Sequence, residues 1–195
     1  MSEDIVERDW PAGVAVYALP KALFREVATT ETPQGIVTLV RMRTFELQNV
    51  LGAGPAILLD GIQDPGNAGA IVRAAEAFGG AGVVFLKSTV SPYNPKCLRA
   101  SAGSLFRLPF VNHPVGEDVV RALEGVALYA AMPGARVSIG EVDWKKPSAV
   151  VIGSEGRGVS MEWVGRSTGV RIPTVGVESL NAAVAAAVIL YEARR

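Results

Sequence analysis

The sequence predicts an α/β protein in which helices flank a parallel β-sheet, and two observations support this fold class. From residue 55 onward, short and continuously apolar segments alternate with stretches of helical periodicity. Such segments are typical of parallel strands that are covered on both faces. Hydrophobic residues make up 49% and charged residues 19% of the 195 residues. This composition belongs to a compact globular chain and not to a disordered one.

The predicted elements follow one another with short connections. Apolar and β-branched content predicts strands over residues 56–59, 83–86, 109–111, 127–131, 149–152 and 170–172. Helical spacing predicts helices over residues 67–78, 95–102, 117–123, 161–164 and 179–195. In the first of these helices the core positions recur at helical spacing, and Arg73 falls on the opposite side. These core positions are Ile71, Ala74, Ala75 and Phe78.

The last predicted helix is apolar on most of its circumference. Leu180, Val184, Val188 and Tyr191 fall on one stripe, and alanines occupy most of the remaining positions. Small side chains allow another backbone to approach closely. We therefore expect this helix to be buried on more than one side, either in the core or at a subunit contact.

The character of the sequence changes near residues 52–55, which read Gly-Ala-Gly-Pro. We place a boundary there, between a first domain over residues 1–52 and a second over residues 53–195. In the first domain we expect strands over residues 15–17 and 36–40 and a helix over residues 20–29. A unit of this size seldom buries enough apolar surface to fold alone, so we expect it to pack on the rest or to belong to a larger domain.

Composition excludes several classes of site. Nineteen basic residues balance nineteen acidic ones, so any affinity for phosphate must come from a local basic patch. Cys97 is the only cysteine and His113 the only histidine, which excludes a disulfide, a Cys/His zinc site and a Cys–His nucleophile within one chain. We expect no metal. Residues 1–10 are acidic and unlike a secretory signal, and the apolar run 182–190 is too short to span a bilayer, so we expect a cytoplasmic protein without a membrane segment.

The first of three candidate functional loops follows the strand predicted over residues 56–59 and contains the pattern Asn67-x-Gly-x-x-x-Arg73. Asn67 stands where the N-cap of the next helix is expected. One interpretation is a cap followed by a solvated surface charge. The other is a functional site, because a helix N-terminus offers free N–H groups to an anion and a guanidinium suits phosphate.

The second candidate loop, residues 153–158, reads Gly-Ser-Glu-Gly-Arg-Gly and follows a predicted strand. Its glycines permit left-handed turns and close approach of a ligand to the backbone. The pattern is neither a dinucleotide-binding fingerprint nor a phosphate-binding P-loop. Alone, it is also compatible with an ordinary connection between a strand and a helix.

The third candidate loop, residues 172–181, reads Ile-Pro-Thr-Val-Gly-Val-Glu-Ser-Leu-Asn and leads into the last helix. Ser179 and Asn181 are both good cap residues. One cap is enough for one helix. A second polar side chain at an otherwise apolar helix start therefore indicates a further role, which we assign to Asn181.

Together and in this order, the three loops resemble the three motifs of the SpoU, or TrmH-like, branch of the SPOUT RNA methyltransferases. The resemblance covers residues 55–195. It implies a C-terminal trefoil knot whose loops bind S-adenosylmethionine, the methyl donor. Carried onto the matching positions, it implies donor contacts at Ala131, Met132, Gly153, Glu155, Gly158, Ile172 and Leu180.

The resemblance also implies an RNA substrate and a homodimer. Residues 30–37 look like the end of a small RNA-binding domain that precedes the catalytic domain in many members. This favours ribosomal RNA over transfer RNA as the substrate. In the family, the arginine that matches Arg73 is supplied by one subunit to the donor site of the other. Ala70 and Ala77, which flank Arg73 on its stripe, would let two backbones come close.

For a transfer to the ribose 2′-hydroxyl, the resemblance assigns catalytic roles to Arg73, Asn67, Glu155, Ser179 and Asn181. We expect Arg73 to hold a phosphate of the target nucleotide. The alternative role, removal of the hydroxyl proton, suits a guanidinium less because a guanidinium group gives up its proton only with great difficulty and so is a poor general base. Asn67 and Glu155 would orient Arg73 or the ribose. Ser179 and Asn181 would bind the donor loop or the nucleotide.

Other functions stay open at this point. A transfer RNA 2′-O-methyltransferase and an enzyme that protects the ribosome from an antibiotic would carry the same motifs. A knotted RNA-binding module without activity would fit the zero net charge, although intact Asn67, Arg73 and Glu155 argue against it. A generic nucleotide-binding α/β enzyme is disfavoured because both phosphate-loop patterns are missing.

Overall fold

The computed structural model describes residues 10–195, and the chain divides into two compact units, Met1–Met42 and Arg43–Arg195. This division lies ten residues before the boundary expected from the sequence, since residues 43–52 belong to the second unit. Among the described residues, no helix is long and apolar enough to cross a bilayer.

In the first unit, the described residues contain the helix α1 (Lys21–Val27), which buries Phe24. The expected helix over 20–29 is therefore present but shorter. The strands expected over residues 15–17 and 36–40 do not form. Leu39, for example, is 96% exposed. β-branched residues favour extended backbone, but a strand is stabilised by pairing and burial, and these segments gain too little of either.

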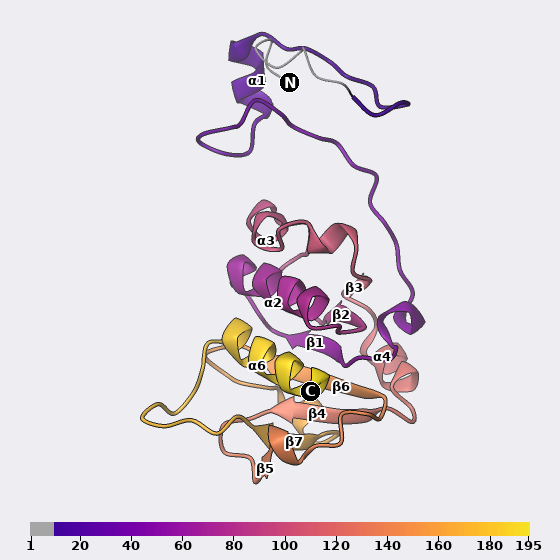
Figure 1. Ribbon diagram of the computed structural model, residues 1–195, viewed down its shortest axis with the longest axis vertical. Coiled ribbons are helices and arrows are strands. Elements are labelled where there is room, and N and C mark those ends of the chain that lie inside the picture. Colours follow the sequence, from indigo (N-terminus) through magenta and orange to yellow (C-terminus); the bar gives the residue numbers. More distant parts are fainter. Residues whose placement is uncertain (1–9) are drawn as a thin grey trace. The chain divides into compact units, whose positions relative to one another are not determined.

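The second unit contains a sheet of seven parallel strands in the order β3-β2-β1-β6-β4-β7-β5 (Figure 1). The predicted fold class is thus confirmed. The strands are β1 (Ala56–Asp60), β2 (Gly82–Phe85), β3 (Phe110–Asn112), β4 (Ala127–Ala131), β5 (Val137–Ser138), β6 (Ser148–Gly153) and β7 (Thr168–Arg171). Six correspond to predicted strands. β5 was missed because two residues carry no periodic signal.

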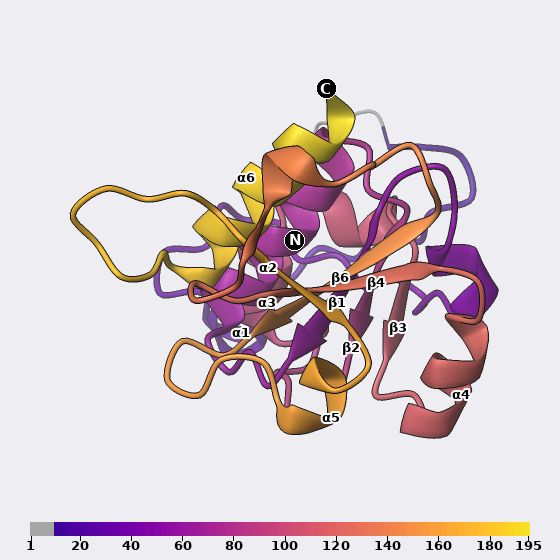
Figure 2. The same ribbon diagram turned by 90° about the horizontal axis from the view of Figure 1, so that it is seen from below.

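Helices cover both faces of this sheet (Figure 2). The α-helices are α2 (Pro65–Ala77), α3 (Pro95–Ala100), α4 (Gly116–Ala122), α5 (Met161–Val164) and α6 (Ala182–Arg194), and the 3₁₀ helices are η2 (Leu47–Val50), η3 (Ser104–Phe106) and η4 (Ile139–Glu141). Alternate residues of a strand face opposite sides. Accordingly, Ile57 and Leu59 pack in one cluster with α2 and α6, while Leu58 packs in a second cluster with Val119 of α4 and Trp163 of α5.

Helix α2 begins earlier than the sequence analysis expected, and Asn67 is not its N-cap. Asp64 is the N-cap, its side chain accepts a hydrogen bond from the backbone N–H of Asn67, and Pro65 occupies the first helical position. Proline is favoured there because its missing N–H would have no partner within the helix. The Asn67 side chain is consequently available for other contacts.

Helix α6 begins after Asn181, which is its N-cap, so Ser179 lies in the preceding loop and does not cap the helix. The buried residues of α6 are Ala182, Ala186, Ile189 and Leu190. The stripe expected from the sequence contains Val184 and Tyr191, which are 48% and 56% exposed. The predicted stripe is therefore largely the outward face of the helix, because a helix that is apolar all round does not reveal which side packs on the sheet.

The parallel strands bring the candidate loops together. All strands of the sheet point the same way, so their carboxyl ends share one edge, where ligands bind in open α/β sheets. β1 ends at Asp60 and its neighbour β6 ends at Gly153, and these two residues are paired in register. The first and second candidate loops thus leave the sheet side by side.

Candidate active site

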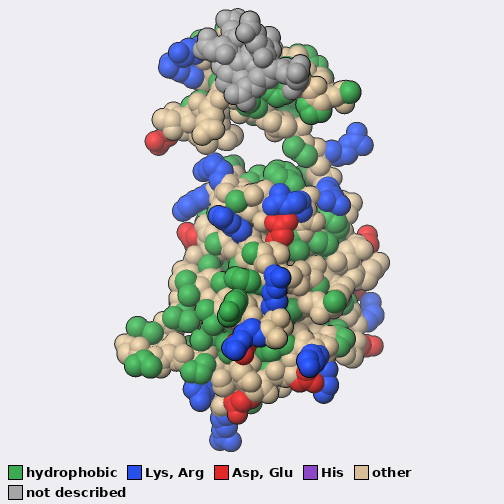
Figure 3. Space-filling view, viewed as in Figure 1, with side chains coloured by type: hydrophobic (Ala, Val, Ile, Leu, Met, Phe, Trp, Pro, Cys, Tyr) green, Lys and Arg blue, Asp and Glu red, His purple; other side chains and the backbone are tan. Residues whose placement is uncertain are grey.

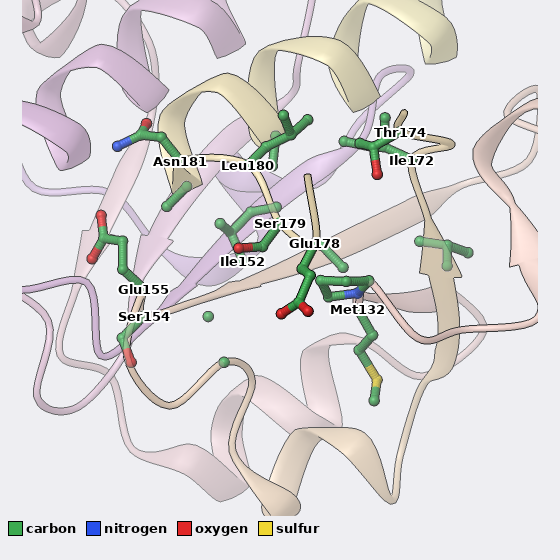
Figure 4. Close-up of a pocket in the computed structure, with 17 residues that line it drawn as sticks. Met132, Ile152, Ser154, Glu155, Ile172, Thr174, Glu178, Ser179, Leu180 and Asn181 are labelled. Carbon is green, nitrogen blue, oxygen red and sulfur yellow. The ribbon is translucent and has the colours of Figure 1, made fainter. Parts of the chain in front are cut away.

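A cavity of about 330 Å³ lies at the carboxyl ends of β4, β6 and β7, beside the start of α6 (Figure 4). Its volume is within the range of about 300–1,000 Å³ that is usual for small-molecule sites. Apolar side chains, including Ile152, Val170 and Leu180, line its inner part. Glu155, Glu178 and other polar residues stand at its exposed rim.

The loop after β6 is folded back on itself. Ser154 and Gly158 form an antiparallel bridge, and Gly158 has a φ of 68° in the left-handed region. A Cβ atom on Gly153 would lie 2.1 Å from the backbone carbon of Gly158. Both glycines are therefore required by the backbone. The turn places Glu155 at the mouth of the cavity.

Asn67 links the three candidate loops through its side-chain amide. Its Nδ2 donates a hydrogen bond to Oε1 of Glu155, and its Oδ1 accepts one from Nδ2 of Asn181 at 3.1 Å. Oδ1 of Asn181 in turn accepts from the backbone N–H groups of Ala183 and Val184. Figure 4 shows Glu155 and Asn181 on the same side of the cavity. We call Asn67, Glu155 and Asn181 the amide clasp.

Asp64 fixes the first residue of this clasp. Its carboxylate accepts the backbone N–H of Asn67 at 2.7 Å and lies 3.6 Å from Nζ of Lys96. The hydrogen bond from Asn67, followed by the positive charge of Lys96, lowers the pKa of Asp64 below its ordinary value. Asp64 thus holds the clasp as a carboxylate at neutral pH.

The structure gathers most of the predicted site residues around the cavity. All seven predicted donor-contact residues line it, as do Ser179 and Asn181. Asn67 reaches it through Glu155. Arg73 does not line it; it lies further along α2 with an exposed side chain. The catalytic and binding roles themselves stay predictions.

Several lining residues were missed by the sequence analysis. Glu178 and Thr174 belong to the third loop, but neither stands at a motif or cap position that would single it out. Ile152 and Val170 look like ordinary core residues in sequence. The positions of Ile152 and Val170 near the ends of predicted strands could have indicated them, because residues at the carboxyl ends of parallel strands commonly contact a ligand.

Cys97 and His113 lie outside this cavity. Cys97 is buried, and burial raises the pKa of its thiol to about 11, so at neutral pH it is an uncharged core residue. Nε2 of His113 lies 2.9 Å from the backbone oxygen of Thr89. Among residues 10–195, no cluster of three His, Cys, Asp or Glu side chains could hold a metal ion.

A parallel sheet with a ligand-sized cavity at its carboxyl edge, bordered by a Gly-rich loop and an amide clasp, is the arrangement of an α/β protein with a small-molecule site beside exposed polar groups. Comparison with known proteins specifies this class. Residues 54–191 match the family model described as the SpoU rRNA Methylase family. The chain belongs to the SpoU rRNA methylase family.

Individual relatives agree with this assignment. The chain is 35% identical to the 23S rRNA (guanosine(2553)-2′-O)-methyltransferase RlmP of Bacillus subtilis over 98% of its own length and 77% of that enzyme's. Its fold matches the SpoU methyltransferase AviRb of Streptomyces viridochromogenes with a TM-score of 0.82 and 32% identity, covering 91% of this chain and 71% of the other. An AdoMet-bound rRNA methyltransferase of Sinorhizobium meliloti gives a TM-score of 0.83 with 29% identity, covering 91% and 70%.

Proposed function

We propose that this chain transfers the methyl group of S-adenosylmethionine to the 2′-hydroxyl of a ribose in RNA, with ribosomal RNA as the substrate. One observation carries the proposal: three loops that are far apart in sequence meet at one cavity through the amide clasp. Family membership supports the same reaction, since the Bacillus subtilis and Sinorhizobium meliloti relatives are rRNA methyltransferases by name.

The cavity at the carboxyl ends of β4, β6 and β7, which we call the donor cavity, has the chemistry that S-adenosylmethionine requires. Its apolar inner part, with Ile152, Ile172 and Leu180, suits the flat face of an adenine. The carboxylates of Glu155 and Glu178 at the rim suit the positive charges of the donor, since opposite charges attract most strongly where water is partly excluded. When bound, this donor supplies a methyl group on a sulfonium that a hydroxyl oxygen can attack. The related AviRb has been solved in complex with AdoMet.

The chain's own task is to position the ribose. A 2′-hydroxyl is a weak nucleophile, so its oxygen must be held in line with the methyl group while its proton leaves. In this proposal the amide clasp fixes Glu155 and Asn181 at the cavity mouth, where they orient the ribose together with Ser179. Arg73 holds a phosphate of the target nucleotide, for which its planar guanidinium is suited.

A homodimer would bring Arg73 to a cavity that it does not reach within its own chain. Figure 3 shows hydrophobic side chains gathered over α6 and α2 on the exposed face of the second unit. On α6 this face includes Val184 and Tyr191, which are about half exposed. An apolar helix face of this kind is typical of a subunit contact. We propose that α2 and α6 pack on a second copy, and that Arg73 of one protomer serves the cavity of the other.

Arg73→Ala tests the reaction and the dimer together. We expect this variant to bind S-adenosylmethionine normally by calorimetry but to lose transfer of labelled methyl groups to total RNA. Glu155→Ala should also be inactive. If Arg73 acts across the interface, a one-to-one mixture of the two variants regains about a quarter of the wild-type activity, because half of the dimers then contain one intact site of two.

Two outcomes would contradict these assignments. Full methyl transfer by Arg73→Ala would remove Arg73 from the mechanism. A tag on one variant shows whether the two variants exchange subunits. If they do and the mixture stays inactive, Arg73 and Glu155 of the same chain act at one site. Mapping the labelled nucleotide then identifies the RNA, and label found only in transfer RNA would favour the alternative substrate.

Three further parts of the proposal come from the family resemblance. Residues 1–52 would contribute to RNA binding, and the catalytic domain over residues 53–195 would carry the chemistry. The trefoil knot in the region of the second and third loops stays a prediction. The cytoplasm is the proposed location, since that is where ribosomal RNA of bacterial relatives such as the Bacillus subtilis enzyme is found.

A further inference from the structure

A second cavity, of about 560 Å³, lies at the same edge of the sheet, at the carboxyl ends of β1, β2 and β3. Asp60 ends β1, Lys87 and Ser88 follow β2, and His113 follows β3. Val115 stands at its margin, 64% exposed. We call the surface formed by these five residues the β1–β3 groove. The reaction proposed above leaves it without a role.

The groove and the donor cavity are neighbours that share a wall. Asp60 lines the groove and Gly153 lines the donor cavity, and these residues are register partners on adjacent strands, which lie about 4.8 Å apart. The loop from Gly153 to Ser160 separates the two cavities. A residue of the groove holds the C-terminal end of this loop, because Oδ2 of Asp60 accepts a hydrogen bond from the backbone N–H of Ser160 at 2.7 Å.

The groove offers the mixture of groups that binds a nucleotide. Lys87 has an exposed ammonium group that suits a phosphate. Asp60, Ser88 and Glu162, which also lines this cavity, present hydrogen-bonding oxygens that suit the edge of a base. His113 has an aromatic ring whose Nε2 is directed at the backbone oxygen of Thr89 at 2.9 Å, and such rings stack on unpaired bases.

Two residues of the groove have strained backbones. Ser88 has a φ of 69° and His113 a φ of 48°, and among residues 10–195 only Ala102 is another non-glycine residue with positive φ. Side chains disfavour this left-handed region. Non-glycine residues held there concentrate at ligand sites, where the surrounding structure enforces the conformation. Both of these residues line the groove.

We propose that the β1–β3 groove binds an unpaired nucleotide of the substrate RNA next to the one that is methylated. This inference rests on the proposed function. A 2′-hydroxyl is present on every unmodified nucleotide, so the methyl-transfer site alone does not select its target. Sequence-specific proteins read RNA mainly through unstacked bases in single-stranded regions. A groove beside the donor cavity is suitably placed to read one.

A crosslinking experiment tests occupancy of the groove without requiring activity. The full chain, saturated with S-adenosylhomocysteine, is irradiated with a pool of single-stranded RNA 12-mers that each carry one 4-thiouridine. We expect crosslinked peptides that contain residues 86–88 or 113–116, and we expect them to disappear in Lys87→Glu/His113→Ala. Crosslinks confined to other peptides would overturn the proposal.

The kinetic test uses Lys87→Glu alone, because Lys87 is exposed and its replacement should not disturb folding. We expect KM for total ribosomal RNA to rise about tenfold, as for the loss of one specific contact, while kcat and donor affinity stay unchanged. Lys145→Glu is the matched control. Lys145 is also exposed but precedes β6, at the opposite edge of the sheet, and the KM of this variant should stay near that of the wild type.

Different results would contradict the proposed methyl transfer and the proposed nucleotide binding in the groove. Groove crosslinks without methyl transfer to any RNA would support the groove and contradict the proposed reaction. Methyl transfer by the wild type with an unchanged KM in Lys87→Glu and no groove crosslinks would contradict the groove alone. Unfolding temperatures of all variants show whether each result comes from a folded protein.

Discussion

At the scale of single residues, the site depends on one amide that both donates and accepts. Asn67 donates to Glu155 with Nδ2 and accepts from Asn181 with Oδ1. Neither carboxylate nor aliphatic side chains offer this pair of functions. Aspartate has the same size and can accept from Asn181, but it cannot donate to Glu155.

Asn67→Asp should therefore separate shape from hydrogen bonding. The new carboxylate would face that of Glu155, and like charges at hydrogen-bond distance repel. We expect kcat to fall at least about a hundredfold, as for other lost preorganised contacts. Because the clasp is exposed, the melting temperature should change little. Steady-state kinetics and thermal unfolding measure the two effects.

Gln63→Glu is the matched control for this substitution. It adds the same charge four residues earlier, in the exposed loop that precedes α2, at a residue that does not line the donor cavity. Its activity should remain near that of the wild type. Equal losses of activity in Asn67→Asp and Gln63→Glu would show that added negative charge near the start of α2 matters and that the clasp does not.

At the scale of elements, a salt bridge joins α2 to the segment after η3. Nη2 of Arg107 donates to Oε2 of Glu76 at 2.8 Å, and its Nε donates to Oε1. The hydrogen bonds from Arg107, with a smaller one from Ser104, lower the pKa of Glu76 from 4.5 to about 2. A carboxyl group with a depressed pKa stabilises the folded state above its unfolded pKa, and this stabilisation is lost as pH falls towards the folded value.

Glu76→Gln should lower the free energy of unfolding at pH 7 by about 1 kcal/mol, because the Arg107 side chain is 59% exposed and solvent screens the pair. The deficit should be constant above pH 5 and should shrink between about pH 4.5 and pH 2, as Glu76 becomes protonated in the parent protein. Urea denaturation at several pH values measures it. Glu124→Gln, on the opposite face of the sheet, is the control, and a deficit that did not depend on pH would contradict the ionic origin.

At the scale of the whole molecule, one exposed apolar face remains to be explained. Val184 and Tyr191 lie on the outward side of α6, and their burial in a dimer would offset the cost of exposing them to water. The residues that line the donor cavity, in contrast, include neither Val184 nor Tyr191. Binding of the donor and assembly of the complete active site should thus be separable.

Val184→Asp should separate binding of the donor from assembly of the dimer. An acidic residue in the first turn is compatible with the helix dipole, so α6 should still form. A charge in an apolar contact should abolish dimers in sedimentation experiments at micromolar concentration, together with methyl transfer. Donor binding by calorimetry should persist. Arg121→Asp on α4, on the other face of the sheet, should stay dimeric and active, and a Val184→Asp dimer would contradict the proposed interface.

The sequence by itself determined the alternation of strands and helices in the second unit, because burial on both faces of a parallel sheet produces apolar runs that can be recognised in the chain. It also singled out Asn67, Glu155 and Asn181, through the joint pattern of three motifs. Its prediction of strands in the first unit was wrong, since β-propensity does not show whether a segment finds a partner strand.

Only the tertiary structure decided how these residues cooperate. Asp64 and Pro65 begin α2, which frees Asn67 for contacts with residues 88 and 114 positions away. The sequence also did not reveal which side of α6 faces outward, or that the residues of the β1–β3 groove lie together. Local preferences act over a few residues, whereas a shared sheet edge depends on the order of strands, which brings β1 beside β6 and places two cavities on either side of their ends.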